Sequence, residues 1–392
     1  MSRGTRVEAA AVLSGQHIKW TLEQLERETQ QKVRIDWLRF TMPLDAVVRR
    51  EILPCPVMAE LAAMSKHERE QQLMCRIADA SLDYCGAQVI AAAAAKQVAE
   101  LLGVFEVGQP EDKGMDYYTA RCALMHEGKV VGHALAGSKS PHQVGTVHVN
   151  LHGEACLYVS PAKWKVLREW IAADSGWLTR VDLACDVWSG DRIEDVPRAY
   201  LAGAFDGRGQ RPKESQAGSW VSGHSRTFYV GKRETGKLFR AYEKGDQLFG
   251  EEAADPWLRY EVELRNNARI LDLDVLTRPA DFFAGAYEFT AALLDRLDAH
   301  AVAQVIPAGQ KLQDATAEAA VFRFTRGFVR AGAPAFCWLL SHGGDILDFI
   351  VQSEAHRVPG RLRGFSTNAL REAFQTVAAG FAPPGAPSIN GA

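Results

Sequence analysis

The sequence lacks the cysteine pattern of a disulfide-stabilised or zinc-binding protein. Its seven cysteines are scattered along 392 residues, and none of them forms a C-x-x-C motif. An odd and dispersed set of cysteines predicts reduced thiols, the state that a cytosol maintains. We therefore expect a cytoplasmic protein without a disulfide framework.

Long hydrophobic runs and an excess of positive charge are also missing. The most apolar stretch, residues 89–105, is interrupted by Lys96 and Glu100 and is too short to cross a bilayer, so no membrane partner is expected. The N-terminus lacks the continuous apolar core of a secretory signal. The net charge of −3 gives no global attraction for nucleic acid, although a local basic groove is enough to hold a phosphate backbone.

What is present divides the chain into four parts. Residues 1–32 are polar and rich in Gln and Glu, which predicts a polar arm, either a frayed helix or disordered. Residues 33–275 contain the predicted strands, and residues 276–379 have helical periodicity. Residues 380–392 are rich in Pro and Gly and are expected to be disordered.

The order of the elements within residues 33–275 indicates an α+β fold with a central antiparallel sheet and helices on one face. Alternation and helical periodicity distinguish the two kinds of element. Strands are predicted within residues 33–42, 117–133, 144–159, 179–187 and 227–265, and helices within residues 56–103 and 161–173. The second and third of these strand regions are each expected to hold a strand pair.

Acidic and basic residues alternate along two of the predicted strands. Successive side chains of a strand point to opposite faces, so the carboxylates of each strand share one face with interleaved arginines. The four carboxylates are Asp182, Asp186, Glu261 and Glu263. On a dry face they would repel one another unless a hard divalent cation such as Mg²⁺ or Mn²⁺ bound them. The alternative is that the arginines neutralise them on a solvated face.

Two tyrosines, Tyr229 and Tyr242, lie in a predicted hairpin. Tyr242 is the stronger candidate for a nucleophile because Arg240 and Lys244 flank it at two residues on either side. Nearby cations lower the cost of ionising a phenol, and they also bind phosphate. Ordinary packing is the alternative for each tyrosine. A two-residue turn would place Tyr229 opposite Tyr242, whereas a three-residue turn would not.

The hairpin also contains a sequence that imitates a phosphate-binding loop. Residues 231–237 read GKRETGK, which matches G-x-x-x-x-G-K. A phosphate-binding loop requires Ser or Thr next, followed by a helix, whereas Leu238 continues a predicted strand. A β-turn is therefore the better interpretation of its glycines.

Histidines and a further acid lie on other predicted strands. His148 and His152 are about 13 Å apart if both lie in one strand, so they cannot share a metal ion. One of them could still reach the carboxylates from an adjacent strand. Asp36 and Arg39 are interpreted as structural residues. Three aromatic residues are candidates for stacking on unpaired bases, with core packing as the alternative: Trp188, Trp220 and Phe239.

Four segments resemble the Rep_trans family, the replication initiation factors of filamentous phages and small rolling-circle plasmids. They are IDWLRFT, TRVDLACD, FYVGKRETGKLFRAYEKGDQ and WLRYEVELR, which occur in this order within residues 33–275. The resemblance implies an RRM-like antiparallel sheet with flanking helices. It also implies nicking of one origin strand through a 5′-phosphotyrosine intermediate, later religation, and assistance by Mg²⁺ or Mn²⁺.

The resemblance carries over to particular residues of this chain. The arginine-x-tyrosine nicking motif of the family falls on Arg240 and Tyr242, Lys244 matches the following basic residue, and Tyr229 is a second candidate. The acidic metal ligands of the family correspond to Asp182, to Glu261 or Glu263, and less directly to Asp186.

The same resemblance implies which partners to expect. They are single-stranded or hairpin origin DNA, a host helicase and a second copy of the chain, in the cytoplasm of a bacterial host. Two alternative functions stay open, a non-catalytic DNA-binding regulator and a metal-dependent nuclease that uses water. The C-terminal residues after about 275 match no pattern of the family.

Overall fold

The computed structural model describes most of the first three quarters of the chain. The described residues are 9–44, 46–48, 64, 65, 68, 86–138, 140, 143–207, 210–267, 269–307, 370, 371 and 374. The chain divides into two compact units, residues 1–306 and 307–392. None of the described helices has the length and apolarity of a bilayer-spanning segment.

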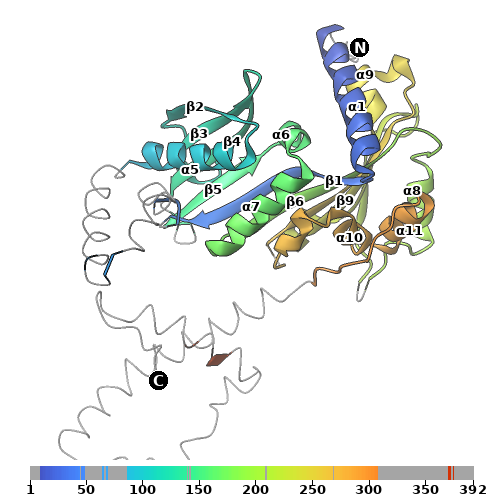
Figure 1. Ribbon diagram of the computed structural model, residues 1–392. Helices are drawn as coiled ribbons and strands as arrows, with labels where there is room; N and C mark the ends of the chain where they lie inside the picture. The colour runs from blue at the N-terminus through green and yellow to red at the C-terminus, as the bar shows by residue number, and fades with distance from the viewer. Residues whose placement is uncertain are drawn as a thin grey trace, which may run out of the picture. The chain divides into compact units, whose positions relative to one another are not determined.

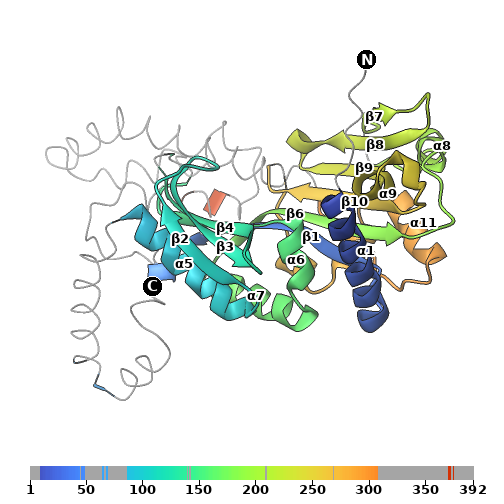
Figure 2. The ribbon, with the colours of Figure 1, turned by 90° about the horizontal axis from the view of Figure 1, so that it is seen from above.

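A ten-stranded sheet forms the centre of the first unit (Figures 1 and 2). Its order is β2-β3-β4-β5-β1-β6-β10-β9-β8-β7, and every pair of neighbours is antiparallel. The strands are β1 (Val33–Pro43), β2 (Glu106–Glu111), β3 (Tyr118–His126), β4 (Lys129–Ser138), β5 (Thr146–Leu151), β6 (Trp177–Val187), β7 (Glu214–Ser219), β8 (His224–Lys232), β9 (Lys237–Glu243) and β10 (Leu258–Arg265). The predicted α+β fold with a central antiparallel sheet is therefore confirmed.

Helices cover one face of this sheet, where α5, α7 and α10 lie side by side over the strands (Figure 1). Among the described residues of the first unit, the helices are α1 (Ala9–Thr29), α5 (Ala87–Leu102), α6 (Gly153–Tyr158), α7 (Pro161–Ala173), α8 (Asp195–Leu201), α9 (Lys244–Phe249), α10 (Pro279–Ala284) and α11 (Glu288–Arg296). Short 3₁₀ turns are η1 (Arg233–Thr235), η2 (Glu251–Ala253) and η3 (Leu273–Leu276).

The hydrophobic core lies between the helices and the sheet. Phe40 of β1 meets Trp170 of α7 edge to face, with ring centroids 6.0 Å apart. At the other end of the sheet, Phe205 packs against Phe239 of β9 at 4.9 Å and against Tyr287 at 5.2 Å. Because strands alternate, the residues between these apolar ones point to the opposite face, which is polar.

The strand β1 contains an irregularity that matters for the polar face. Its pairing with β6 shifts between Ile35 and Trp37, so that Asp36 is the extra residue of a bulge. Arg34 stands opposite Ala184, and Trp37 stands opposite Asp182. Simple alternation would place Asp36 and Trp37 on opposite faces, but the bulge allows both to serve the polar face.

Most predicted elements are confirmed, and one is wrong. The strand pair within residues 117–133 is confirmed by β3 and β4, and the helix within residues 161–173 by α7. Of the helical region predicted within residues 56–103, α5 confirms the last part, and residues 56–85 lie outside the described residues apart from positions 64, 65 and 68. The strand pair predicted within residues 144–159 is wrong in its second half, because the chain forms α6 after β5. A Cβ at Gly153 would lie 2.8 Å from the carbonyl oxygen of Asp36, so this glycine lets α6 begin close against β1.

The chain on either side of residues 33–275 contributes further helices. Residues 9–29 form α1, which is tied to the remainder of the unit by Lys19 with Asp255 at 2.7 Å and by Trp188 with Glu26 at 2.9 Å. Of the region predicted to be helical, residues 276–306 contain α10 and α11 and belong to the first unit. The remainder of that region and the predicted tail lie outside the described residues, apart from positions 307, 370, 371 and 374.

Candidate active site

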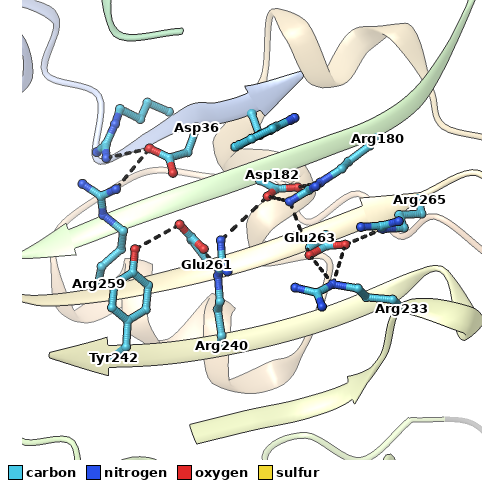
Figure 3. A network of polar contacts seen from close by, with 12 residues as sticks. Asp36, Arg180, Asp182, Arg233, Arg240, Tyr242, Arg259, Glu261, Glu263 and Arg265 are labelled. Carbon is cyan, nitrogen blue, oxygen red and sulfur yellow. Dashed lines mark hydrogen bonds and ion pairs between the residues drawn. The ribbon is translucent and has the colours of Figure 1, made fainter. Parts of the chain in front are cut away.

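Three neighbouring strands bring the sequence-predicted residues onto the polar face. Tyr242 of β9 stands opposite Arg259 of β10, which stands opposite Asp186 of β6. In the next row of this face, Arg240 stands opposite Glu261. The row beyond it joins Glu263 to Asp182. Figure 3 shows the resulting pattern, in which arginines and carboxylates alternate across the strands.

The hydroxyl group of Tyr242 lies among charged groups but away from solvent. It donates a hydrogen bond to Glu261 Oε1 over 3.3 Å, as Figure 3 shows. The guanidinium carbon of Arg240 is 5.7 Å from the ring centroid, and Lys244 Nζ is 5.5 Å from it. The sequence predicted that these cations would lower the pKa of the phenol. Arg240 acts in this direction, as does Arg259, but burial outweighs both and raises the pKa of Tyr242 well above its usual value.

Glu261 is the carboxylate nearest to this tyrosine, and it has an acidic neighbour. Burial and the carboxylate of Asp36 raise the pKa of Glu261 to about 7, against the opposing effect of Arg240 and Arg259. Asp36 lies within hydrogen-bonding reach of Glu261. Burial acts to raise the pKa of Asp36, but Arg259 and Arg34 outweigh it and hold that pKa well below its usual range. The two neighbouring carboxyl groups therefore differ in the direction of their pKa shifts, which is downward for Asp36 and upward for Glu261.

Asp36 was assigned a structural role from the sequence, and its position beside Glu261 was missed. Plain alternation along VRIDWLRF gives no reason to bring it next to β10, because β6 lies between the two strands. Asp36 shares the polar face with Arg34 by alternation, and the bulge at Asp36 lets Trp37 reach the same face. An acidic residue within an otherwise alternating strand was the only available signal.

Glu261 is ion-paired with Arg240, and the other three carboxylates are also held by arginines. Asp186 accepts hydrogen bonds from Arg259 Nε at 2.7 Å, from Trp257 Nε1 at 2.6 Å and from Arg34. Asp182 binds Arg180 Nη2 at 2.5 Å. Glu263 is in contact with three arginines, Arg180 at 3.5 Å, Arg233 at 3.1 Å and Arg265.

The pairing of acids with arginines is thus realised, although on a buried face and not on a solvated one. Asp182, Asp186, Glu261 and Glu263 are between 1% and 4% exposed. Within the part of the chain that the structure describes, no group of three or more His, Cys, Asp or Glu residues is placed to hold a metal ion. As they stand, the four carboxylates do not form one ligand set. Asp36 and Glu261 form a pair of oxygen donors in mutual contact.

Tyr229 lies on the same face as Tyr242. The hairpin between β8 and β9 pairs Lys232 with Lys237 and therefore has a four-residue loop, neither the two-residue nor the three-residue loop considered from the sequence. Tyr229 stands opposite Arg240, one diagonal step from Tyr242, and is half-buried. The loop contains the 3₁₀ turn η1 and ends on Gly236 with φ of 74°, so the prediction of a turn in GKRETGK is confirmed.

The histidines do not reach the carboxylates. His148 and its strand β5 lie between β4 and β1, so β1 and β6 separate them from β10. His148 is hydrogen-bonded to Thr41 over 2.9 Å, and His152 packs against Trp37 with ring centroids 5.0 Å apart. The possibility that one histidine joins the carboxylate site is therefore wrong.

The aromatic candidates for base stacking pack within the protein. Phe239 is fully buried in the core. Trp188 packs against Trp257 at 4.9 Å, and Trp220 packs against Phe228 at 6.2 Å. Core packing is thus the better account of Phe239.

Comparison with known proteins supports one family for part of this chain. Residues 176–304 match the Rep_trans family, described as replication initiation factor. This segment runs from β6 to the chain after α11, so it contains both tyrosines and the four carboxylates but not Asp36. A solved rolling circle replication initiator protein from Geobacillus stearothermophilus is similar at 18% identity, over 67% of this chain and 84% of that chain, with a TM-score of 0.41. No curated protein matches the chain.

Proposed function

Because residues 176–304 match the replication initiation factors, we propose that this protein initiates rolling-circle replication by nicking one strand of origin DNA with a tyrosine. One observation carries the proposal. The hydroxyl group of Tyr242 lies 3.3 Å from a buried carboxylate, and arginines flank it on its own strand and on the next. A nucleophile beside a proton acceptor and beside cations that bind phosphate is the arrangement that phosphoryl transfer needs.

In the proposed step, the phosphoryl group at the nick is transferred from the 3′ oxygen of the DNA to the hydroxyl oxygen of Tyr242. Tyr242 Oη forms a bond to phosphorus while the bond from phosphorus to the 3′ oxygen breaks. Glu261, the acceptor in contact with the hydroxyl group, takes the tyrosine proton, and the 3′ oxygen takes a proton from solvent. The products are a 5′-phosphotyrosine and a free 3′-OH that can prime synthesis. The reverse reaction religates the strand without ATP, because the phosphotyrosine retains the ester bond.

Three cations are available to the phosphoryl oxygens. Arg240 and Arg259 stand on either side of the Tyr242–Glu261 pair, and both are held in place by carboxylates. Burial and Arg259 lower the pKa of Lys244 to about 8, so its ammonium group remains mostly protonated at pH 7. Preorganised charges of this kind stabilise the negative charge that develops in the transition state.

A divalent cation, Mg²⁺ or Mn²⁺, belongs to the proposal, and the structure offers one fit for it. Asp36 and Glu261 supply two hard oxygen donors whose mutual repulsion a cation would relieve. Asp182 lies on the strand between them. Each of these three carboxylates, like Asp186 and Glu263, is paired with an arginine. When bound, the ion would polarise the scissile phosphate.

The direct test compares two single substitutions on DNA that carries the origin. We expect Tyr242→Phe to abolish both nicking and the covalent protein–DNA adduct on a denaturing gel, while single-strand binding persists. Tyr229→Phe is the matched control, because it removes a hydroxyl group from the same face one diagonal step away. Loss of the adduct in Tyr229→Phe alone would transfer the role to that residue. Nicking without any adduct would favour a nuclease that uses water, and a wild-type protein that binds without nicking would favour a regulator.

A further inference from the structure

A second polar cluster lies on the same face of the sheet, toward β4, and the proposed chemistry leaves it unused. His133, Asn150 and Arg39 stand directly opposite one another on β4, β5 and β1. Trp37 and His152 complete what we call the Trp37 cluster. The His152 ring is 5.0 Å from Trp37 and 5.7 Å from His133 between centroids.

Three hydrogen-bonding atoms of this cluster are buried and have no partner. They are His133 Nδ1, Asn150 Nδ2 and Arg39 Nε, one from each of three adjacent strands. Asn150 is 0% exposed. Buried polar atoms in folded proteins are nearly always paired, and each unpaired one costs about 1–3 kcal/mol. Three of them in one row indicate a site that a ligand completes.

The hydrogen bonds that are present determine what such a ligand must offer. Trp37 Nε1 donates to Asn150 Oδ1 over 2.8 Å, so the amide is oriented with its Nδ2 donor free. Arg39 Nε also can only donate. Burial, together with His152, lowers the pKa of His133 to about 4, so the imidazole is neutral at pH 7 and can donate or accept. The ligand must therefore present at least two acceptor atoms.

The charge and shape of the cluster favour a flat ligand over an anion. Arg39 is paired with Asp116 at 3.1 Å, so its positive charge is largely balanced. The guanidinium groups of Arg180 and Arg39 lie over the Trp37 ring, at 4.8 and 6.0 Å from its centroid. A ring that holds planar cations on its face can hold a base there instead when the guanidinium group of Arg39, the more exposed of the two, moves from the face of the ring to the edge of the base.

We infer that the Trp37 cluster binds one unpaired DNA base, stacked on Trp37 and read by Asn150 and Arg39, and that guanine is the base it prefers. Guanine presents two adjacent acceptors, O6 and N7, to such donors. Trp37 and Tyr242 are separated by three strand spacings across the sheet and by four residues along the strands. This separation corresponds to a distance of about 20 Å. This base lies several nucleotides from the scissile phosphate. The inference rests on the proposed function and extends it to sequence recognition.

The test measures binding of the full chain to a pool of single-stranded oligonucleotides with a randomised block, followed by sequencing of the bound fraction. For Trp37→Ala and Asn150→Leu we expect about 5-fold to 100-fold weaker binding and loss of a guanine preference at one position. Trp20→Ala is the matched control, since Trp20 is 60% exposed on α1, and it should leave both readouts unchanged. Circular dichroism verifies that each variant is folded. Trp37→Phe, which keeps an aromatic ring but loses the hydrogen bond to Asn150, replaces any variant that does not fold.

Two outcomes would overturn the inference, and a third would overturn it together with the proposed function. In one outcome, the variants lose binding equally on the randomised pool and on a pool with abasic sites in place of the randomised block. This result would show a phosphate contact and overturn the inference. An unchanged base profile in folded variants, with wild-type binding and nicking intact, would overturn this inference alone. Absence of any single-strand binding by the wild-type protein would overturn the inference together with the proposed function.

Discussion

Individual arginines decide what each carboxylate of the polar face can do. A buried carboxylate requires compensation by charges or hydrogen bonds, because its removal from water costs several kcal/mol. Asp186 receives this compensation from two arginines and a tryptophan, so its carboxylate oxygens have little capacity left to bind another group. Glu261 has Arg240, Tyr242 and an acidic neighbour, and burial together with that neighbour raises its pKa to about 7.

Asp186 should therefore prove structural. We expect Asp186→Asn to lower the free energy of unfolding by about 3–5 kcal/mol at pH 7, because it leaves Arg34 and Arg259 without their buried partner. Urea unfolding measures this effect. Asp195→Asn is the control, since its ion pair with Arg198 is exposed and should contribute less than about 1 kcal/mol.

The same residue gives a pH dependence of stability. Burial opposes ionisation of Asp186, but Arg259 and Arg34 outweigh it and lower its pKa in the folded protein. A lowered pKa stabilises the fold above the unfolded value of about 3.9 and loses that effect as the pH falls through the folded value. The difference in stability between wild type and Asp186→Asn should thus shrink in acid. A constant difference down to pH 3 would contradict the role of this charge.

Metal removal tests the Asp36–Glu261 pair. We expect EDTA to stop cleavage while single-strand binding persists, and we expect added Mg²⁺ or Mn²⁺ to restore cleavage, because only the chemical step needs the cation. Asp36→Asn should raise the concentration of Mn²⁺ needed for half-maximal cleavage. Asp116→Asn serves as the control, since Asp116 pairs with Arg39 on another part of the sheet. Full cleavage in EDTA would remove the cation from the proposal.

At the scale of elements, the β8–β9 hairpin sets the position of Tyr242. Its loop ends on Gly236 with φ of 74°, and a Cβ there would lie 2.8 Å from the carbonyl oxygen of Arg265 at the end of β10. The carbonyl oxygen of Gly236 accepts a hydrogen bond there from Arg265 N over 3.0 Å. The hairpin is therefore fixed to β10, the strand that carries Glu261.

Replacement of this glycine should loosen the hairpin. Gly236→Ala incurs both the strain of a positive φ and a collision with Arg265, whereas Gly128→Ala incurs only the strain, because a Cβ at Gly128, with φ of 77°, meets nothing within 4 Å. We expect Gly236→Ala to destabilise the protein by about 1–3 kcal/mol more than Gly128→Ala in urea unfolding. Equal effects would show that the hairpin does not depend on this close contact.

Periodicity predicted the elements whose faces are cleanly two-sided. The alternation in β6 and β10 placed Asp182 with Asp186, and Glu261 with Glu263, on common faces, as the structure has them. Prediction from periodicity failed where a bulge or a helix interrupts the alternation of a strand. The bulge at Asp36 and the helix that begins at Gly153 both depend on the close approach of β1 and α6, which local sequence does not encode.

At the scale of the molecule, the core of the first unit extends beyond the last strand. Phe283 and Tyr287 are buried, and Tyr287 packs against Phe205 and Phe239. The fragment 1–306 should therefore unfold in one cooperative transition in urea. The fragment 1–275, which ends at the boundary predicted from the sequence, should lose cooperativity because it exposes this part of the core. Cooperative unfolding of the shorter fragment with undiminished stability would favour that boundary.

The class of the fold was predictable, but the order of its strands was not. Neighbouring strands in the sequence form the pairs β2–β3–β4–β5 and β7–β8–β9–β10. The two groups are joined through β1 and β6, and that union depends on packing of the whole unit over α7 and α10. The pairing of Arg39 with both Asn150 and Arg180, and hence the Trp37 cluster, follows only from this order.

The central place of β1 also bears on how the chain is made. Trp37 and its hydrogen-bond partner Asn150 are 113 residues apart, and β6, on the other side of β1, follows later still. At the usual rate of translation, the ribosome needs on the order of ten seconds to deliver those partners. During that interval Leu38 and Phe40 have no sheet to enter, so β1 is the segment that a chaperone would shield on the nascent chain.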